Sequence, residues 1–245
     1  MTGQGLSGKR VVIIGGTSGM GFAVAQAALA DGAASVFVAS SGEDNVKSAV
    51  ERLGKGADGA VMNVRDESSV ASVFERIGAL DHLVYTAGDW APFRTPMPIA
   101  ELDMADTGAI FAIRFWGAVI AVKHAARIIA KDGSITLTDG MIAHRPRKGA
   151  ALSTAMAGAV EHLTQGLAVD LAPLRVNCVC PGLTLTGAWN SMPEENRAQL
   201  VQRTAPQPLP RPGEPSEVAQ AYLFLMRGGY TTGQVLRVDG GRSIV

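Results

Sequence analysis

The sequence predicts an α/β fold: a single doubly wound domain with a sheet of about seven parallel strands and helices on both faces. Short β-branched runs alternate about seven times with longer helical segments, which is typical of a parallel sheet. No linker, charge block or low-complexity tract interrupts this alternation. The chain has 245 residues, which is within the usual length of one α/β domain.

The expected strands are short apolar runs that stop at glycine or at a polar residue, as strands buried on both faces do. Residues 11–14 illustrate the pattern, because their β-branched side chains are followed at once by Gly15. Strands are expected at residues 11–14, 35–39, 59–64, 80–86, 133–138, 175–180 and 234–238.

The expected helices lie between these strands and carry apolar residues at helical spacing. Val70, Val73 and Phe74 share one face of the third helix, and the first helix ends at Asp31-Gly32, a C-cap signal. Helices are expected at residues 19–30, 43–53, 66–77, 102–130, 149–171 and 215–226.

One segment departs from the alternating pattern. Residues 181–213 are rich in proline and polar residues, which predicts a long irregular excursion from the sheet. A loop of that length in a compact domain is usually functional, so we expect it to lie over a substrate. No break in composition isolates it, and residues 1–245 are expected to form one domain.

Composition excludes several classes of protein. The 22 basic and 22 acidic residues leave no basic surplus, so we expect no nucleic-acid partner. Two cysteines are too few for a disulfide scaffold or a cysteine-rich zinc site, and we expect no metal. Residues 1–8 lack the apolar core of a signal peptide, and the apolar stretch 111–122 is too short to cross a membrane. We therefore expect a cytoplasmic protein with no membrane partner.

A glycine-rich turn lies between the first strand and the first helix. Gly15, Gly19 and Gly21 have the spacing Gly-x-x-x-Gly-x-Gly. Glycines there permit a tight turn and a close approach of the backbone to a pyrophosphate, which the N-terminus of the helix attracts. The alternative is a tight strand–helix turn without a ligand. The position of the turn after the first strand of an alternating chain favours a dinucleotide site.

Five motifs in the same order give the chain a resemblance, over its whole length, to the short-chain dehydrogenase/reductase family. They are the glycine turn with Ile14 in place of the usual Thr, Asn63-Val64, Tyr85-Thr86-Ala87-Gly88, Arg175-Val-Asn177 with Pro181-Gly182, and Val238-Asp-Gly-Gly241. The resemblance implies a Rossmann-type domain, a nicotinamide cofactor, a small-molecule substrate and assembly into a homodimer or homotetramer.

The resemblance also assigns the cofactor-binding residues. They are Gly15, Thr17, Ser18, Gly19, Met20, Gly21, Ser40, Ser41, Asn63, Val64, Ala87, Gly88, Pro181, Gly182, Thr184 and Thr186. The second strand ends in Ala39-Ser40-Ser41, without the acid that selects NAD, so NADP is not repelled there. No arginine follows to select NADP, and Glu43 and Asp44 oppose it. We expect NADP(H), with NAD(H) as the alternative.

The positions of the family's catalytic residues differ in this chain. The segment Val160-Glu161-His162-Leu163-Thr164 fixes the register, which puts Ser153 at the family's Tyr position and Ala157 at its Lys position. The Ser position falls on Gly140, beside Asp139, and the Asn position falls on Arg114. No tyrosine lies between Tyr85 and Tyr222, so a shift of register does not restore the pattern.

Four residues remain as candidates for the chemistry: Arg114, Asp139, His144 and Ser153. Arg114 could supply a fixed positive charge but cannot give up a proton, and its alternative role is a buried ion pair, for example with Asp139. His144 titrates near neutrality, although its basic loop could simply be solvated. Tyr85 could line the pocket or pack in the core.

Three hypotheses about function follow from these residues. The first is an oxidoreductase that moves hydride to or from a small, partly apolar carbonyl, alcohol or imine, with a non-standard proton donor. The second is an inactive NAD(P)(H)-binding pseudoenzyme, and the third is a non-redox enzyme on the same fold. The apolar side chains that suggest a partly apolar substrate are Trp90, Pro92, Phe93, Trp189 and Met192.

Overall fold

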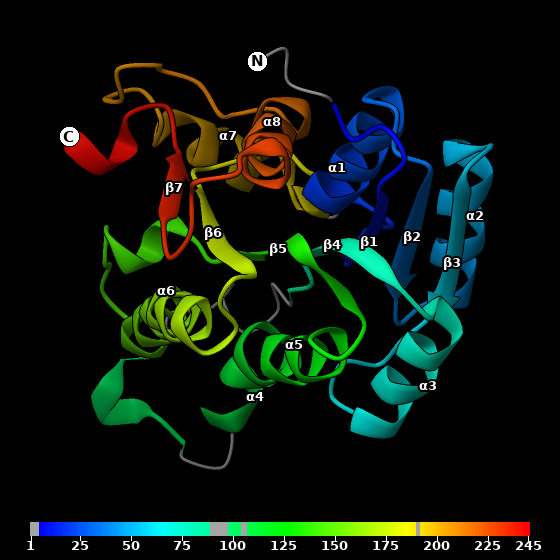
Figure 1. The fold of residues 1–245 in the computed structure, drawn as a ribbon. Helices are drawn as coiled ribbons and strands as arrows, with labels where there is room; N and C mark the ends of the chain where they lie inside the picture. The colour runs from blue at the N-terminus through cyan, green and yellow to red at the C-terminus, as the bar shows by residue number, and fades with distance from the viewer. Residues whose placement is uncertain (1–4, 89–97, 104–106, 190–191) are drawn as a thin grey trace.

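The computed structural model describes residues 5–88, 98–103, 107–189 and 192–245 (Figure 1). Its sheet has seven strands in the order β3-β2-β1-β4-β5-β6-β7, and every pairing is parallel. The doubly wound fold predicted from the sequence is therefore confirmed. The strands are β1 (Arg10–Ile14), β2 (Ser35–Ser40), β3 (Ala57–Val61), β4 (Leu80–Tyr85), β5 (Ile129–Thr138), β6 (Arg175–Pro181) and β7 (Val235–Val238).

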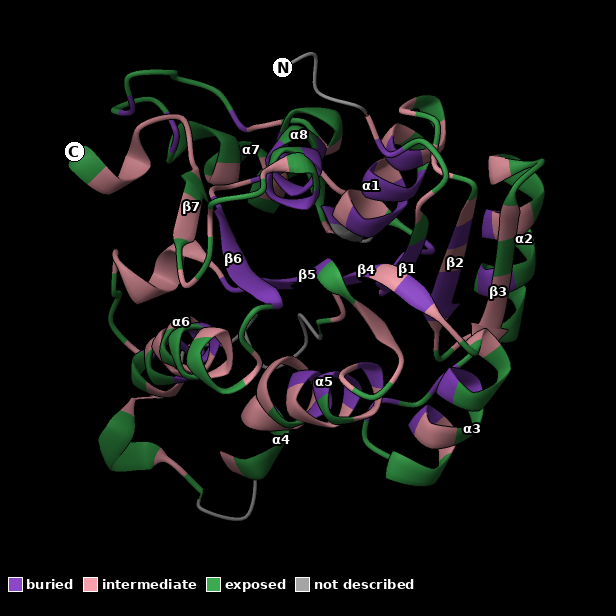
Figure 2. Ribbon diagram, viewed as in Figure 1, coloured by how far each residue is buried: buried purple, intermediate pink, exposed green. Residues whose placement is uncertain are grey.

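Helices cover both faces of the sheet and bury two apolar cores (Figures 1 and 2). One face packs against α1 (Gly19–Ala30), α2 (Glu43–Leu53) and α8 (Pro215–Arg227). The other packs against α3 (Glu67–Ile77), α4 (Thr107–Phe111), α5 (Ala118–Ala125) and α6 (Ala151–Asp170). Strand β6 is buried along its whole length, including the polar residues Arg175 and Asn177.

The prediction of one long helix at residues 102–130 is wrong in two respects. The helical segment is not a regular α-helix, and it ends before residue 129. The described part begins with α4, continues as a π-helical turn at Ala112–Gly117, which we call the π turn, and ends with α5. Residues 129 and 130 belong to β5 instead. The wider turn is matched to Tyr85, whose hydroxyl donates to the carbonyl oxygen of Ile113 at 2.5 Å. A side chain at Gly117 would collide with the same hydroxyl.

The stretch Thr107–Ala125 is long and apolar enough, by length and composition, to cross a membrane. Its apolar residues Ile110, Ala118 and Val122 belong instead to the core beneath the sheet. These three residues pack as the buried residues of a helix in an α/β domain do.

The excursion expected at residues 181–213 is less irregular than predicted. It contains the helix α7 (Glu194–Gln202), which starts after Pro193 and carries two acidic residues in its first turn. Pro181 is the last residue of β6, and Thr184 makes an isolated bridge to Gly213. The segment therefore leaves the sheet and returns to it beside its starting point.

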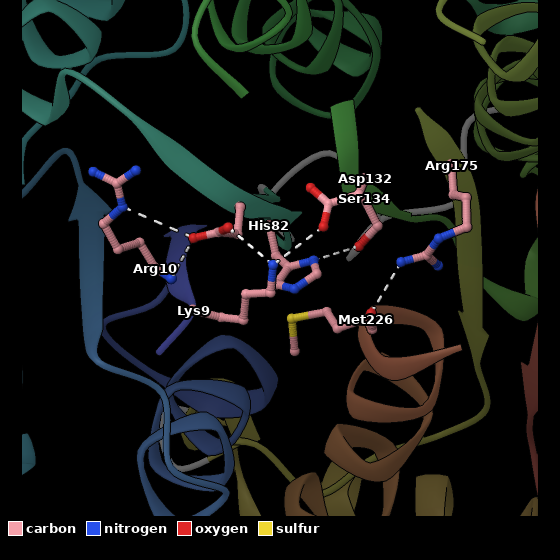
Figure 3. Close-up of polar contacts among 8 residues, drawn as sticks. Lys9, Arg10, His82, Asp132, Ser134, Arg175 and Met226 are labelled. Atoms are coloured by element: carbon pink, nitrogen blue, oxygen red, sulfur yellow. Dashed lines mark hydrogen bonds and ion pairs between the residues drawn. The ribbon is translucent and has the colours of Figure 1, made fainter. Parts of the chain in front are cut away.

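Polar side chains secure the amino edge of the sheet (Figure 3). His82 is buried and accepts or donates a hydrogen bond at Ser134 Oγ, 2.9 Å from its Nδ1. Burial lowers the pKa of His82 to about 4, so the ring is neutral near pH 7. Lys9 makes ion pairs with Asp81 and Asp132 at 3.2 and 3.4 Å.

Arg175 ends this cluster and caps α8. Its guanidinium donates to the carbonyl oxygens of Leu225 and Met226 at 2.5 and 2.9 Å. These carbonyls lie in the last turn of α8, where no intrahelical donor is available and a positive charge is favoured. One buried arginine on β6 therefore holds the helix against the sheet.

We predict that Arg175→Met lowers the free energy of unfolding by about 1.5–3 kcal/mol, because charge-assisted hydrogen bonds to two carbonyls are lost. Urea denaturation followed by circular dichroism measures the change. Lys131→Met, an exposed neighbour on the same edge, should stay within about 0.5 kcal/mol of the wild type. Equal effects of the two substitutions would contradict the capping role.

Candidate active site

A cavity of about 540 Å³ lies at the carboxyl edge of the sheet, where doubly wound domains bind their ligands. It is bounded by the turn between β1 and α1 and by the ends of β2, β3 and β4. The expected cofactor residues that line it are Gly15, Thr17, Ser18, Gly19, Met20, Gly21, Ser40, Ser41, Asn63, Val64, Ala87, Gly88 and Thr186. The structure therefore gathers most of the residues assigned from the sequence in one place.

The glycine turn fits a dinucleotide because backbone, not side chains, forms its walls. Gly15 has a φ of +86°, and a Cβ there would lie 2.5 Å from the main-chain nitrogen of Ala87. A Cβ on Gly21 would fall on the carbonyl oxygen of Gly15. The N-terminus of α1 has no acidic residue in its first turn, so its free N–H groups favour an anion such as a pyrophosphate.

Three residues assigned to the cofactor do not line this cavity. Pro181 ends a buried strand, and a Cβ on Gly182 would lie 2.7 Å from the Cα of Asp239. The hydroxyl of Thr184 donates to the carbonyl oxygen of Gly182 at 3.1 Å. Of the residues assigned to the cofactor after β6, Thr186 therefore lines the cavity, and Pro181, Gly182 and Thr184 do not.

Arg65 lines the same cavity and was missed from the sequence. Strands β2 and β3 pair so that Ser40 lies opposite Val61, which carries the residues after β3 to the end of β2. Arg65 thus shares the lining with Ser40 and Ser41, where the sequence suggested that no arginine was available. The other lining residues that were not assigned are Ile14, Ala39, Met62, Thr86, Ile113 and Gly187.

Arg114 extends from the π turn to the end of β4. A Cβ on Gly88 would lie 2.8 Å from its guanidinium, so the absence of a side chain there admits the arginine. Its Nη1 donates to the main-chain oxygen of Asp139 at 3.2 Å. The structure thus brings Arg114 and Asp139 together through the backbone of Asp139, not through its carboxylate.

Asp139 and His144 converge on Glu161, which sequence reasoning did not select. His144 Nε2 lies 2.6 Å from Glu161 Oε1, and the Nδ1 of the same ring lies 3.2 Å from Arg237. Burial, and secondly the Glu161 carboxyl, raises the pKa of Asp139 to about 8. Glu161 lies two turns after Ser153 on α6, a spacing that could have pointed to it.

The tyrosines and α6 offer no accessible phenol at this edge. Tyr85 is buried and bonded to Ile113, so its role is packing and not pocket lining. Tyr222 is buried with its hydroxyl 2.7 Å from Thr138 Oγ1, and Tyr230 is fully exposed on the chain after α8. Burial raises the pKa of both Tyr85 and Tyr222 above the ordinary value. Ser153 is itself buried.

A second cavity, of about 810 Å³, lies beside Thr186 under α7. Leu185, Trp189 and Val201 give it apolar walls, and Glu194 and Arg197 supply charge. Trp90, Pro92 and Phe93, which were also expected over the pocket, lie outside the described residues. Met192 is described but does not line either of these two cavities.

A Rossmann-type sheet with a glycine cradle at its carboxyl edge defines a dinucleotide-binding protein. The family model described as enoyl-(acyl carrier protein) reductase matches residues 15–243. The chain is 37% identical to the short-chain dehydrogenase/reductase ucsE of Acremonium sp over 263 residues, which covers 99% of this chain and 98% of that protein. The chain therefore belongs to the short-chain dehydrogenase/reductase family of NAD(P)-dependent oxidoreductases.

Solved structures agree with this assignment. A small-chain dehydrogenase in complex with NADPH is 34% identical, with a TM-score of 0.80 over 98% of this chain and 100% of that chain. The MalC reductase/Diels-Alderase from Malbranchea aurantiaca is 31% identical, with a TM-score of 0.89 over 98% of this chain and 97% of that chain. The resemblance seen in the sequence motifs is thus confirmed at the level of family and fold.

We predict that Gly15→Ala abolishes detectable NADPH binding, because the added methyl group meets the backbone of Ala87 and cannot move away. Titration with NADPH, followed by its fluorescence, measures the binding. Gly158→Ala is the matched control, since no atom within 4 Å opposes a Cβ at that helix position. Unchanged affinity in Gly15→Ala would show that the cradle does not hold the cofactor.

Proposed function

We propose that this chain is an NADP(H)-dependent reductase of a C=O or C=N bond in a small, partly apolar substrate, without the tyrosine and lysine usual in its family. The observation that carries the proposal is the guanidinium of Arg114 at the end of β4, next to an intact dinucleotide cradle. When bound, the nicotinamide supplies the hydride. Arg114 then faces the oxygen or nitrogen on which negative charge develops.

The substituted positions on α6 support a reaction in which Arg114 stabilises charge and another group supplies the proton. Ser153 and Ala157 stand where the family has its tyrosine and lysine, and both are buried. A serine hydroxyl is too weak an acid to protonate an alkoxide near neutrality in place of a phenol. Arg114 remains charged at any working pH, so it can stabilise the product anion but cannot donate its proton. The proton would come from His144, Lys148, the substrate or water.

The lining of the cofactor cavity supports NADP(H) over NAD(H). Ser40 and Ser41 put hydroxyls, and no carboxylate, at the end of β2. Arg65 adds a positive charge to the same lining, which suits the additional phosphate of NADP. One similar solved structure is described as a complex with NADPH.

We predict that Arg65→Ala raises KM for NADPH about tenfold and leaves KM for NADH nearly unchanged, because one charge-assisted phosphate contact is lost. Steady-state kinetics with each cofactor make the comparison. Arg76→Ala, on α3 and outside the cavity lining, serves as the control. A parallel rise for both cofactors would mean that Arg65 does not read the phosphate.

The activity itself is tested by loss of NADPH absorbance over a panel of cyclic and aryl ketones, aldehydes and imines. We expect turnover of at least one class, and Arg114→Met should lower its kcat about 10²–10³-fold, the usual cost of one charge-stabilising donor. Arg127→Met, exposed at the opposite edge of the sheet, should keep wild-type activity. No NADPH oxidation with any substrate would contradict the proposal.

The outcomes also separate the two alternatives. Tight NADPH binding without turnover, unchanged in Arg114→Met, would favour the inactive NADP(H)-binding protein. Substrate consumption without NADPH oxidation would favour a non-redox enzyme, which deserves inclusion because one similar structure is described as a reductase/Diels-Alderase.

We also propose a homodimer or homotetramer. Trp116 on the π turn and Val169 on α6 are exposed large apolar side chains, at 57% and 78%. These elements lie on the same face of the sheet, and their resemblance to the family's assembly helices supports association there.

A further inference from the structure

The carboxyl group of Asp139 is buried without a hydrogen-bond donor. The residue is 1% exposed, and neither carboxyl oxygen has a partner among the described residues. A carboxyl oxygen of Asp139, a ring nitrogen of His144, a carboxyl oxygen of Glu161 and the sulfur of Cys180 all lie within 4.8 Å of one another. An isolated carboxylate in such a place costs several kcal/mol, so a proton, a cation or a metal ion must neutralise it.

Arg114 does not neutralise this carboxyl group. Its Nη1 bonds to the main-chain oxygen of Asp139, and the carboxyl oxygens have no partner. The ion pair that the sequence allowed between these two residues is therefore not formed. The Arg114 guanidinium is thus bonded to the backbone of Asp139 and not to its carboxyl group, and this arrangement needs a physical cause.

The tautomer of His144 argues against a metal ion. Arg237 can only donate, so the Nδ1 of His144, 3.2 Å from its Nη2, must accept. The proton of the neutral ring is then on Nε2 and points at Glu161, 2.6 Å away. A metal ion bound at Nε2 would require the proton on Nδ1, where it would meet the guanidinium. Glu161 accepts this hydrogen bond from the ring.

We infer that Asp139 is a neutral acid whose proton lies toward the Glu161 carboxyl group, and that this proton leaves Arg114 bonded to the backbone of Asp139. Glu161, oriented by His144 and Arg237, is thus a positioning residue for Arg114. This inference rests on the proposed function for its effect on catalysis. Loss of this proton would create a carboxylate at Asp139, beside Arg114, and draw the guanidinium toward it.

The surroundings of Asp139 are consistent with a neutral acid. The groups that face it from the packed elements are Glu161 on α6, Cys178 and Cys180 on β6, His144 after β5, Arg237 on β7, Arg114 on the π turn and Tyr222 on α8. Burial and the nearby carboxyl groups raise the pKa of both thiols, so the cysteines add no charge.

The first arm of the test needs no substrate. Because the pKa of folded Asp139 is raised to about 8 from an ordinary 3.8, its contribution to stability is complete below about pH 4 and is lost as pH rises to about 8. The melting temperature of the wild type, relative to Asp139→Asn, should therefore fall between pH 5 and pH 8. Carbon-13 NMR of labelled aspartate carboxyls should show one late-titrating signal that is absent in Asp139→Asn.

The second arm uses Glu161→Gln, whose amide can donate to Asp139 and let it ionise. The late NMR signal should then move to lower pH. The alkaline limb of kcat/KM should move the same way, with at least a tenfold loss at pH 7, while Asp139→Asn should lose that limb. His162→Gln, an exposed neighbour on α6, is the matched control and should match the wild type in both readouts.

Two results would overturn the inference. One is an Asp139 signal that titrates near the ordinary aspartate range in the wild type. The other is a cobalt(II)–thiolate absorption band on addition of Co²⁺ that disappears in Cys180→Ser, which would show a metal site. A chain that turns over no substrate would refute the proposed function alone, because the melting and NMR measurements would still decide the protonation of Asp139.

Discussion

The carboxyl edge of the sheet depends on the contact of backbone with backbone between the turn after β1 and the end of β4. A Cβ on Gly15 would lie 2.5 Å from the main-chain nitrogen of Ala87, so the two segments touch without an intervening side chain. This contact fixes the start of α1, which in turn aims its free N–H groups at the cofactor cavity. The same closeness brings Gly88 to the lining of that cavity, and the guanidinium of Arg114 lies beside Gly88. The shape of the cavity and the position of Arg114 beside Gly88 therefore follow from one steric constraint.

The two ends of the site are built by different physical means. The end at the turn between β1 and α1 consists of glycine backbone, helix N–H groups and short hydroxyl side chains. The other end consists of buried ionisable groups, where each charge has to be balanced by an adjacent charge or hydrogen bond. Arg114, Asp139, Glu161 and His144 form a connected set through bonds of 3.2 and 2.6 Å and a close carboxyl pair. A change in one of these groups alters the charge that the others experience.

The fold and the glycine cradle could be predicted from the sequence because both depend on local signals. Strand and helix periodicity located nearly every element, and the glycine spacing located the cavity. The prediction of a single long helix was wrong because the carbonyl oxygen of Ile113 accepts a hydrogen bond from the hydroxyl of Tyr85. These two residues are 28 positions apart in the sequence. Arg65 and Glu161 were missed for the same reason: strand pairing and helix packing, not spacing in the sequence, bring them to the site. Pro181, Gly182 and Thr184 carried the right motif but do not line the cavity, and the Thr184 hydroxyl bonds to the carbonyl oxygen of Gly182.

The π turn sets the rotational phase of everything that follows it. A π turn holds one residue more than the α-helical turn it replaces, so it offsets the helix after it by about 100° relative to an uninterrupted α-helix. Arg114 lies inside the turn, whereas Ala118, Ala121 and Val122 lie after it and face the core. If one residue were removed from the turn, Arg114 and the apolar residues after it could no longer both keep their present directions. The extra residue thus lets a single helix carry a buried apolar stripe and an arginine that reaches Gly88, two demands that a regular α-helix of the same length would place in conflict.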